Sequence, residues 1–219
     1  MDAPPAILEY HEYVINYLER HGKIEIRDNL RIGVDPGQLM MNSNAVDGMA
    51  YARDDTYSWV VYSNDVAKRF ESAWARIKAG RRLGWEGAMT IKLIAHELLH
   101  VREGRNLVDY LDPKIEEATV EAVLNDMITP LIKRHINPVF WEFMNRKSMA
   151  EDATALAYKK CAKSLTAVSV RLSKGSVNSY AARSTRRAFL VMSGTEAKAA
   201  LNKVGMNVNG LCDLNKYYP

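Results

Sequence analysis

The 219 residues carry a formal net charge of +4, and 47% of them are hydrophobic and 26% charged. This composition is typical of a globular protein with one sizeable core. No apolar run approaches the roughly 20 residues of a membrane-spanning helix. The opening residues, MDAPPAILEYHEY, lack the basic and apolar segments of a signal peptide. Cys161 and Cys212 are too few for a disulfide framework. We therefore expect a cytoplasmic protein in a reducing setting, with no membrane partner.

The first third of the chain predicts one helix followed by strands. Pro4 and Pro5 begin a helix that runs to about Arg20. Residues 23–34 alternate like a strand. Residues 49–63 hold two β-rich runs around Asp54-Asp55 and predict a hairpin. Its second strand, 57–63, either lies at a sheet edge, where it could pair with an extended peptide, or is buried in the sheet.

Helices dominate the rest of the chain. Asn64-Asp65 caps one helix, and a second spans about 86–103 with Gly104 as its C-terminal cap. Asp112-Pro113 begins a third, which should stop before Pro130. Further helices are predicted over 138–146, 150–172, 176–192 and 195–204. The fold class is therefore α+β, with one region over 1–146, which holds all the predicted strands, and a basic, mainly helical extension over 147–219 that packs on it.

The stretch AHELLH, residues 95–100, places two histidines four residues apart on a predicted helix. Residues i and i+4 project from one helix face, so His96 and His100 can direct ring nitrogens at one ion. Zn²⁺ accepts such ligands, and Glu97 beside them can take a proton from a metal-activated water. The alternative is an amphipathic helix whose C-terminal dipole favours two histidines without any metal.

A catalytic zinc needs a third protein ligand, and the next predicted helix supplies acidic residues. Glu117 and Glu121 share a face with apolar residues, where a carboxylate is costly without a partner. We expect Glu117 to bind the metal and Glu121 to hydrogen-bond a ligand histidine. Glu116 is the alternative ligand. A solvated acidic face near the helix N-terminus is the competing interpretation of all three. Three weaker candidates are Asp109, Asp112 and His135.

The HELLH motif followed by ExxxE at 117–121 resembles the gluzincin group of zinc metallopeptidases. The resemblance implies a zincin-like fold, in which a small sheet with a hairpin precedes the HExxH helix and the glutamate helix. It also implies one zinc ion per chain and hydrolysis of peptide bonds in a protein or peptide substrate. By position, His96, His100 and Glu117 would be ligands, Glu97 the general base, and Glu121 a residue supporting a ligand.

The chain departs from the gluzincin pattern in two places. The second acid is Glu where the group more often has Asp, and the sixteen residues between His100 and Glu117 are few for the group. The residues MITP at 127–130 are more weakly similar to ImmA-type intracellular peptidases. SprT-type DNA-repair proteases use a related motif.

Charge is unevenly placed along the chain. Residues 151–219 hold eleven basic and four acidic side chains, a net +7, which leaves −3 for residues 1–150. Such a basic region can meet nucleic acid, an acidic partner, or only water. The sequence therefore predicts a cytoplasmic zinc metallopeptidase. The alternative function is a metal-binding regulatory or nucleic-acid-binding module on a zincin fold, without significant proteolysis.

Overall fold

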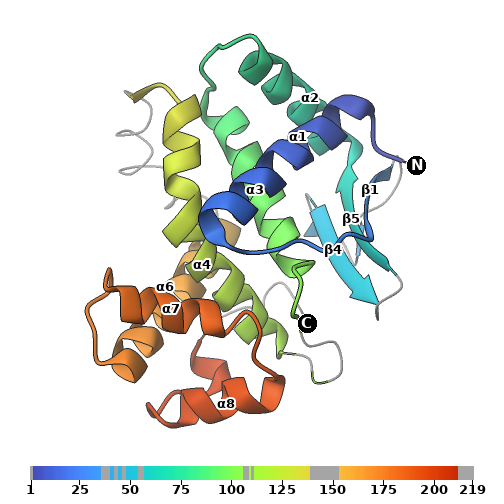
Figure 1. Ribbon diagram of the computed structural model, residues 1–219. Coiled ribbons are helices and arrows are strands. Elements are labelled where there is room, and N and C mark those ends of the chain that lie inside the picture. Colours follow the sequence, from blue (N-terminus) through green and yellow to red (C-terminus); the bar gives the residue numbers. More distant parts are fainter. Residues whose placement is uncertain are drawn as a thin grey trace. The chain divides into compact units, whose positions relative to one another are not determined.

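The computed structural model describes residues 2–35, 40–41, 44–45, 48–53, 57–105, 109, 111–138 and 153–211. These residues form seven α-helices and a small sheet, so the α+β class is confirmed (Figure 1). The chain divides into two compact units, Met1–Glu103 with Met127–Asn145, and Gly104–Asp126 with Arg146–Pro219. The division at residue 146 expected from the sequence stays a prediction. None of the described helices is long and apolar enough to cross a membrane.

The first unit contains a three-stranded sheet in the order β1-β5-β4. Its strands are β1 (Leu30–Asp35), β4 (Gly48–Arg53) and β5 (Tyr57–Ser63). β5 runs antiparallel to β4 and parallel to β1. A separate two-stranded pair consists of β2 (Met40–Met41) and β3 (Asn44–Ala45).

One strand prediction changes in the structure and one open choice is decided, while the hairpin is confirmed with Arg53 opposite Tyr57. The expected strand over 23–34 is regular only from Leu30 onward. β5 is the central strand, so the idea of an edge strand at 57–63 is wrong. Ser58, Val60 and Tyr62 alternate along it and are buried. The apolar alternation that made β5 look like a strand therefore reflects core packing, since side chains two apart share one sheet face.

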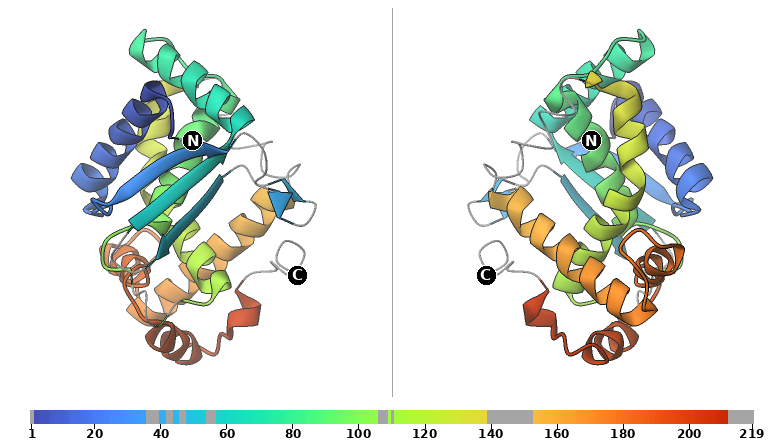
Figure 2. Two further views of the ribbon diagram at one scale, coloured as in Figure 1. Left: turned by 90° about the vertical axis from the view of Figure 1, so that its right-hand side faces the viewer. Right: turned by 90° about the vertical axis from the view of Figure 1, so that its left-hand side faces the viewer.

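Three helices pack together in the first unit and cover one side of the sheet (Figure 2). They are α1 (Pro5–Tyr17), α2 (Asn64–Lys78) and α3 (Trp85–His100). A π-helical turn, η1 (Leu18–Gly22), extends α1 and ends at Lys23, whose φ of 53° is left-handed. Fully buried side chains join the helices to the sheet: Ile7, Tyr10, Val14, Phe70, Ile91, Ile94 and Leu98.

The ends of the two middle helices differ from their predicted caps. The hydroxyl of Ser63 accepts the backbone N–H of Val66, so Ser63 caps α2 in place of Asn64-Asp65. α3 ends at His100, three residues earlier than expected. Gly104 does adopt a positive φ of 70°, but in the turn that follows the helix. A β-bridge between Ile26 and Arg102 takes the chain out of the helix at this point.

α4 (Pro113–His135) begins as predicted and ends later. The carboxylate of Asp112 accepts the backbone N–H of Lys114 at 2.9 Å, which caps the helix. The expected stop before Pro130 is wrong, because the helix continues through this exposed proline. A helix-interior proline costs about 3 kcal/mol. Burial of Leu131 and Ile132 in the following turn offsets that cost.

The second unit has a helical core of its own. Its other helices are α6 (Ala153–Ser173), α7 (Tyr180–Ala188), α8 (Gly194–Asn202) and a 3₁₀ turn, η2 (Val208–Gly210). Residues of α4, α6 and α8 meet in one apolar cluster, which includes Ile115, Leu165 and Leu201. Cys161 in this cluster is disulfide-bonded, which corrects the expectation of reduced cysteines.

Candidate metal centre

The HELLH residues lie in the last turns of α3, on a helix that the core holds firmly. Ile91, Ile94 and Leu98 are fully buried on this helix. His96, Glu97 and His100 are buried as well, with exposed fractions of 9%, 7% and 8%. An amphipathic helix with a solvated polar face would expose these three side chains. Their burial favours a shared function over a surface role.

His96 and His100 face each other across one turn of α3. Their Nε2 atoms are 3.2 Å apart, and the ring centroids are 4.9 Å apart at an interplanar angle of 73°. Two nitrogens on a tetrahedral zinc at ~2.05 Å are separated by ~3.3 Å. The spacing of the ring nitrogens thus equals that of a zinc-bound pair. An N–H···N hydrogen bond between neutral rings has the same spacing, and metal analysis distinguishes the two.

Glu117 of α4 supplies the third group. Ligand atoms of His96, His100 and Glu117 all lie within 4.8 Å of one another. Two imidazoles and a carboxylate form a donor set typical of catalytic zinc. The three residues form a cluster that could hold a metal ion.

The other acidic candidates have different surroundings. Glu116 is 5% exposed, and its Oε1 lies 3.8 Å from Nε of Arg105, which offsets its charge. Glu121 is 3% exposed and lies outside the cluster of three. Asp109 accepts the backbone N–H of Thr195 at 2.9 Å, which lowers its pKa.

The remaining sequence candidates serve local structure. Asp112 caps α4 through the backbone N–H of Lys114. His135 lies 2.6 Å from the hydroxyl of Tyr13, measured from its Nε2. The structure therefore brings Glu117 to the histidine pair, and neither Asp112 nor His135 belongs to the cluster.

A buried polar pair that the sequence analysis missed lies close to Glu97. His11 Nδ1 is 2.8 Å from the carbonyl oxygen of Ile7, so this nitrogen donates. His11 Nε2 then accepts the hydroxyl proton of Tyr62, 2.9 Å away. Burial raises the pKa of Tyr62 well above its usual value, and the negative charge of Glu97 raises it further. Neither side chain belongs to a motif, so only the packing of α1 against β5 could identify the pair.

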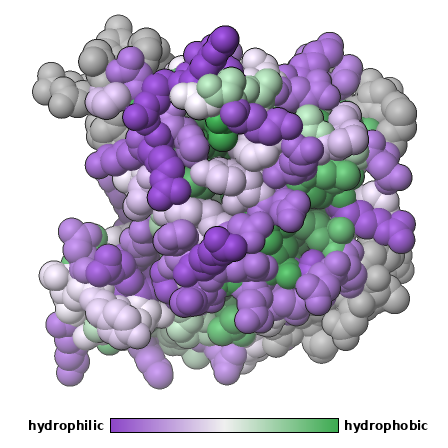
Figure 3. Space-filling model, turned by 45° about the horizontal axis from the view of Figure 1, so that its top comes forward, coloured by the Kyte–Doolittle hydropathy of each residue, from purple (hydrophilic) through white to green (hydrophobic). Residues whose placement is uncertain are grey.

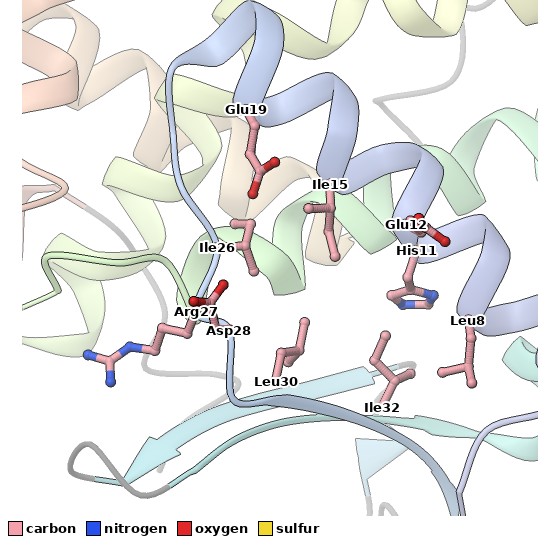
Figure 4. A pocket seen from close by; sticks show the side chains of 10 residues that line it. All are labelled: Leu8, His11, Glu12, Ile15, Glu19, Ile26, Arg27, Asp28, Leu30 and Ile32. Carbon is pink, nitrogen blue, oxygen red and sulfur yellow. The ribbon is translucent and has the colours of Figure 1, made fainter.

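The first unit also has a hollow of about 280 Å³ between α1 and the segment leading into β1 (Figure 4). Its apolar lining comes from Leu8, Ile15, Ile26, Leu30 and Ile32. Acidic side chains of Glu12, Glu19 and Asp28 also line it. The cluster residues are absent from its lining. On the face drawn in Figure 3, hydrophilic residues cover most of the surface and hydrophobic ones gather in smaller areas.

Comparisons of the chain with protein-family models, with curated proteins and with solved structures found no match.

Proposed function

We propose that this protein is a zinc-dependent metallopeptidase of gluzincin type, with one zinc ion per chain. The observation that carries the proposal is the approach of the ligand atoms of His96, His100 and Glu117 to within 4.8 Å of one another. The general base expected by the HExxH pattern, Glu97, is buried on the same helix. The three-stranded sheet and hairpin ahead of α3 support a zincin-like topology.

The donor set favours zinc over harder cations. Mg²⁺ and Ca²⁺ prefer oxygen ligands, whereas imidazole nitrogens suit zinc and other late transition metals. The 3.2 Å separation of the ring nitrogens is the span of two zinc ligands. When bound, zinc would lower the pKa of a coordinated water and polarise the scissile carbonyl. Glu121, buried on α4, would orient a ligand histidine by hydrogen bonding.

Glu97 is the residue that moves protons in this proposal. Its carboxylate accepts a proton from the attacking water and then donates it to the leaving amine. Burial strengthens the interaction of this carboxylate with a cation, because the local dielectric constant is low. The buried hydroxyl of Tyr62 is held by His11 and lies near enough to Glu97 for the negative charge of Glu97 to raise its pKa. The substrate is a protein or peptide.

The first test measures metal content by mass spectrometry on protein purified without a His tag. We expect about one zinc per chain, and loss of that zinc in His100→Ala. The matched control is His21→Ala, which removes an exposed histidine of the first unit. Absence of zinc from the native protein, even after zinc is added back, would refute the metal site.

The second test separates catalysis from binding. Glu97→Gln should keep the zinc and lower cleavage of a mixed peptide library by about 10²–10⁴-fold, the usual contribution of a general base. Glu86→Gln is the control, because Glu86 is an exposed acid on the same helix. Cleavage retained in Glu97→Gln would refute the role of Glu97. Zinc binding without any cleavage by the native protein would support the alternative, a metal-binding module without proteolysis.

A further inference from the structure

The second unit contains a long stretch of chain without acidic residues. No Asp or Glu occurs between Asp152 and Glu196. The stretch holds eight basic side chains: Lys159, Lys160, Lys163, Arg171, Lys174, Arg183, Arg186 and Arg187. A solvated surface normally mixes both signs of charge. A run of one sign is costly through self-repulsion and is typical of a surface that meets an anion.

This stretch forms two helices joined by a short turn. α6 ends at Ser173, and α7 begins at Tyr180 (Figure 1). Lys174 begins the connection with a left-handed φ of 53°. Ser179 ends it and caps α7 by accepting the backbone N–H of Ala182 at 3.2 Å. The two helices pack against each other, so the connection and the cap fix the direction of α7.

One face of α7 is buried and the other is exposed. Ala182 and Arg186 are buried, and Arg186 makes a bidentate pair with Asp126, with Nε–Oδ2 and Nη2–Oδ1 distances of 2.7 Å and 2.9 Å. This arginine is structural. The opposite face carries Tyr180, which is 83% exposed, and the exposed Arg183 one turn later. Arg187 follows on the same face, since residues three and four apart are neighbours on a helix.

The arginines on the open face lack the acidic partners that Arg186 has. Neither Arg183 nor Arg187 forms an ion pair with a described carboxylate. Nε of Arg187 is buried and has no hydrogen-bond partner among the described residues. A buried donor without a partner destabilises a folded chain. Rotation of the Arg187 side chain toward a bound phosphate would expose this donor and give it a partner.

We propose that the open face of α7, defined by Tyr180, Arg183 and Arg187, binds double-stranded DNA together with Lys174 of the preceding connection. An α-helix with side chains is about 10–12 Å wide, and the major groove of DNA is about 12 Å wide. In helix–turn–helix proteins the second helix enters this groove with its N-terminal residues. Tyr180 and Arg183 occupy that end of α7, and the lysine and arginines supply contacts to phosphates.

Double-stranded DNA fits this surface better than an RNA duplex does. The major groove of an RNA duplex is too deep and narrow for a helix to enter. Arginine is suited to phosphate and to guanine edges, both of which it can contact with two parallel hydrogen bonds. DNA binding would be a second activity, since it uses none of the metal-cluster residues.

The test measures binding of the full-length protein to a fluorescent DNA duplex by anisotropy at two salt concentrations. Three phosphate contacts, by Lys174, Arg183 and Arg187, predict that affinity falls about 40-fold between about 50 mM and 200 mM salt. The double variant Arg183→Gln/Arg187→Gln should lower affinity at least tenfold and reduce the salt effect to about fourfold. Lys198→Gln/Lys203→Gln is the matched control, because Lys198 is exposed on α8 and Lys203 is exposed directly after this helix, in the same unit.

Folding and partner class are checked with the same proteins. Tyr180→Ala removes an exposed side chain and should weaken binding with the thermal midpoint unchanged. The proposal is overturned by absence of DNA binding at low salt, or by equal losses in the α7 and α8 double variants. Equal or tighter binding to an RNA duplex, or to a polyglutamate peptide, also overturns it. Glu97→Gln should bind DNA like the native protein, which separates this proposal from the peptidase proposal.

Discussion

His11 should make the stability of this protein depend on pH between about 7 and 4. The side chain is fully buried between α1 and β5. Burial lowers its pKa from 6.5 to about 4, and a hydrogen bond to the carbonyl of Ile7 opposes part of that shift. The neutral ring is therefore the folded form, with Nδ1 donating to Ile7 and Nε2 accepting from Tyr62.

The sign and size of the effect follow from proton linkage. Below pH 6.5 His11 is protonated in the unfolded chain but stays neutral in the folded chain. The free energy of unfolding therefore falls as pH decreases. The contribution of neutral His11 to the free energy of unfolding is fully present above pH 6.5. It is lost progressively as pH falls to the folded pKa of about 4. The full loss is about 3 kcal/mol, and about 2 kcal/mol of it should appear between pH 7 and pH 5.

The assay is urea unfolding of the native protein and of His11→Gln at a series of pH values. The glutamine side chain can accept the hydrogen bond from the hydroxyl of Tyr62, but it does not titrate in this pH range. The difference in unfolding free energy between the two proteins should therefore shift by about 2 kcal/mol from pH 7 to pH 5. A difference that is constant with pH would refute the assignment of a neutral, buried His11. His21→Gln, at an exposed histidine, is the control.

Three further results are expected. Glu117→Gln should weaken zinc binding in equilibrium dialysis, whereas Glu116→Gln should not. Equal losses of zinc affinity in the two variants would contradict the choice of Glu117 as ligand. Zinc at 100 times its Kd should raise the unfolding free energy by about 2.7 kcal/mol, and His100→Ala should abolish this gain in thermal melts. Arg186→Met should cost about 3–5 kcal/mol in urea unfolding, because Asp126 loses its buried partner; a cost below 1 kcal/mol would contradict this.

Local rules predicted the parts of the site that lie on one helix. The 3.6-residue period alone puts His96 and His100 on the same face, and it needs no knowledge of the rest of the fold. The Asp112-Pro113 helix start is local in the same way, since the cap uses atoms only two residues apart. The hairpin between β4 and β5 follows from strand alternation around a short turn.

Interactions between distant residues decided the rest. Sequence spacing left Glu116 and Glu117 as competing ligands, and Glu117 is the one whose carboxylate is grouped with His96 and His100 in the folded chain. Local rules predict that the helix ends before Pro130. Burial of Leu131 and Ile132 after it outweighs the free-energy cost of a proline inside the helix. His11 and Tyr62 are 51 residues apart, so only the packing of α1 against the sheet could reveal their hydrogen bond. Periodicity fixes which side chains share a face, whereas burial and partner choice depend on contacts that only the folded chain makes.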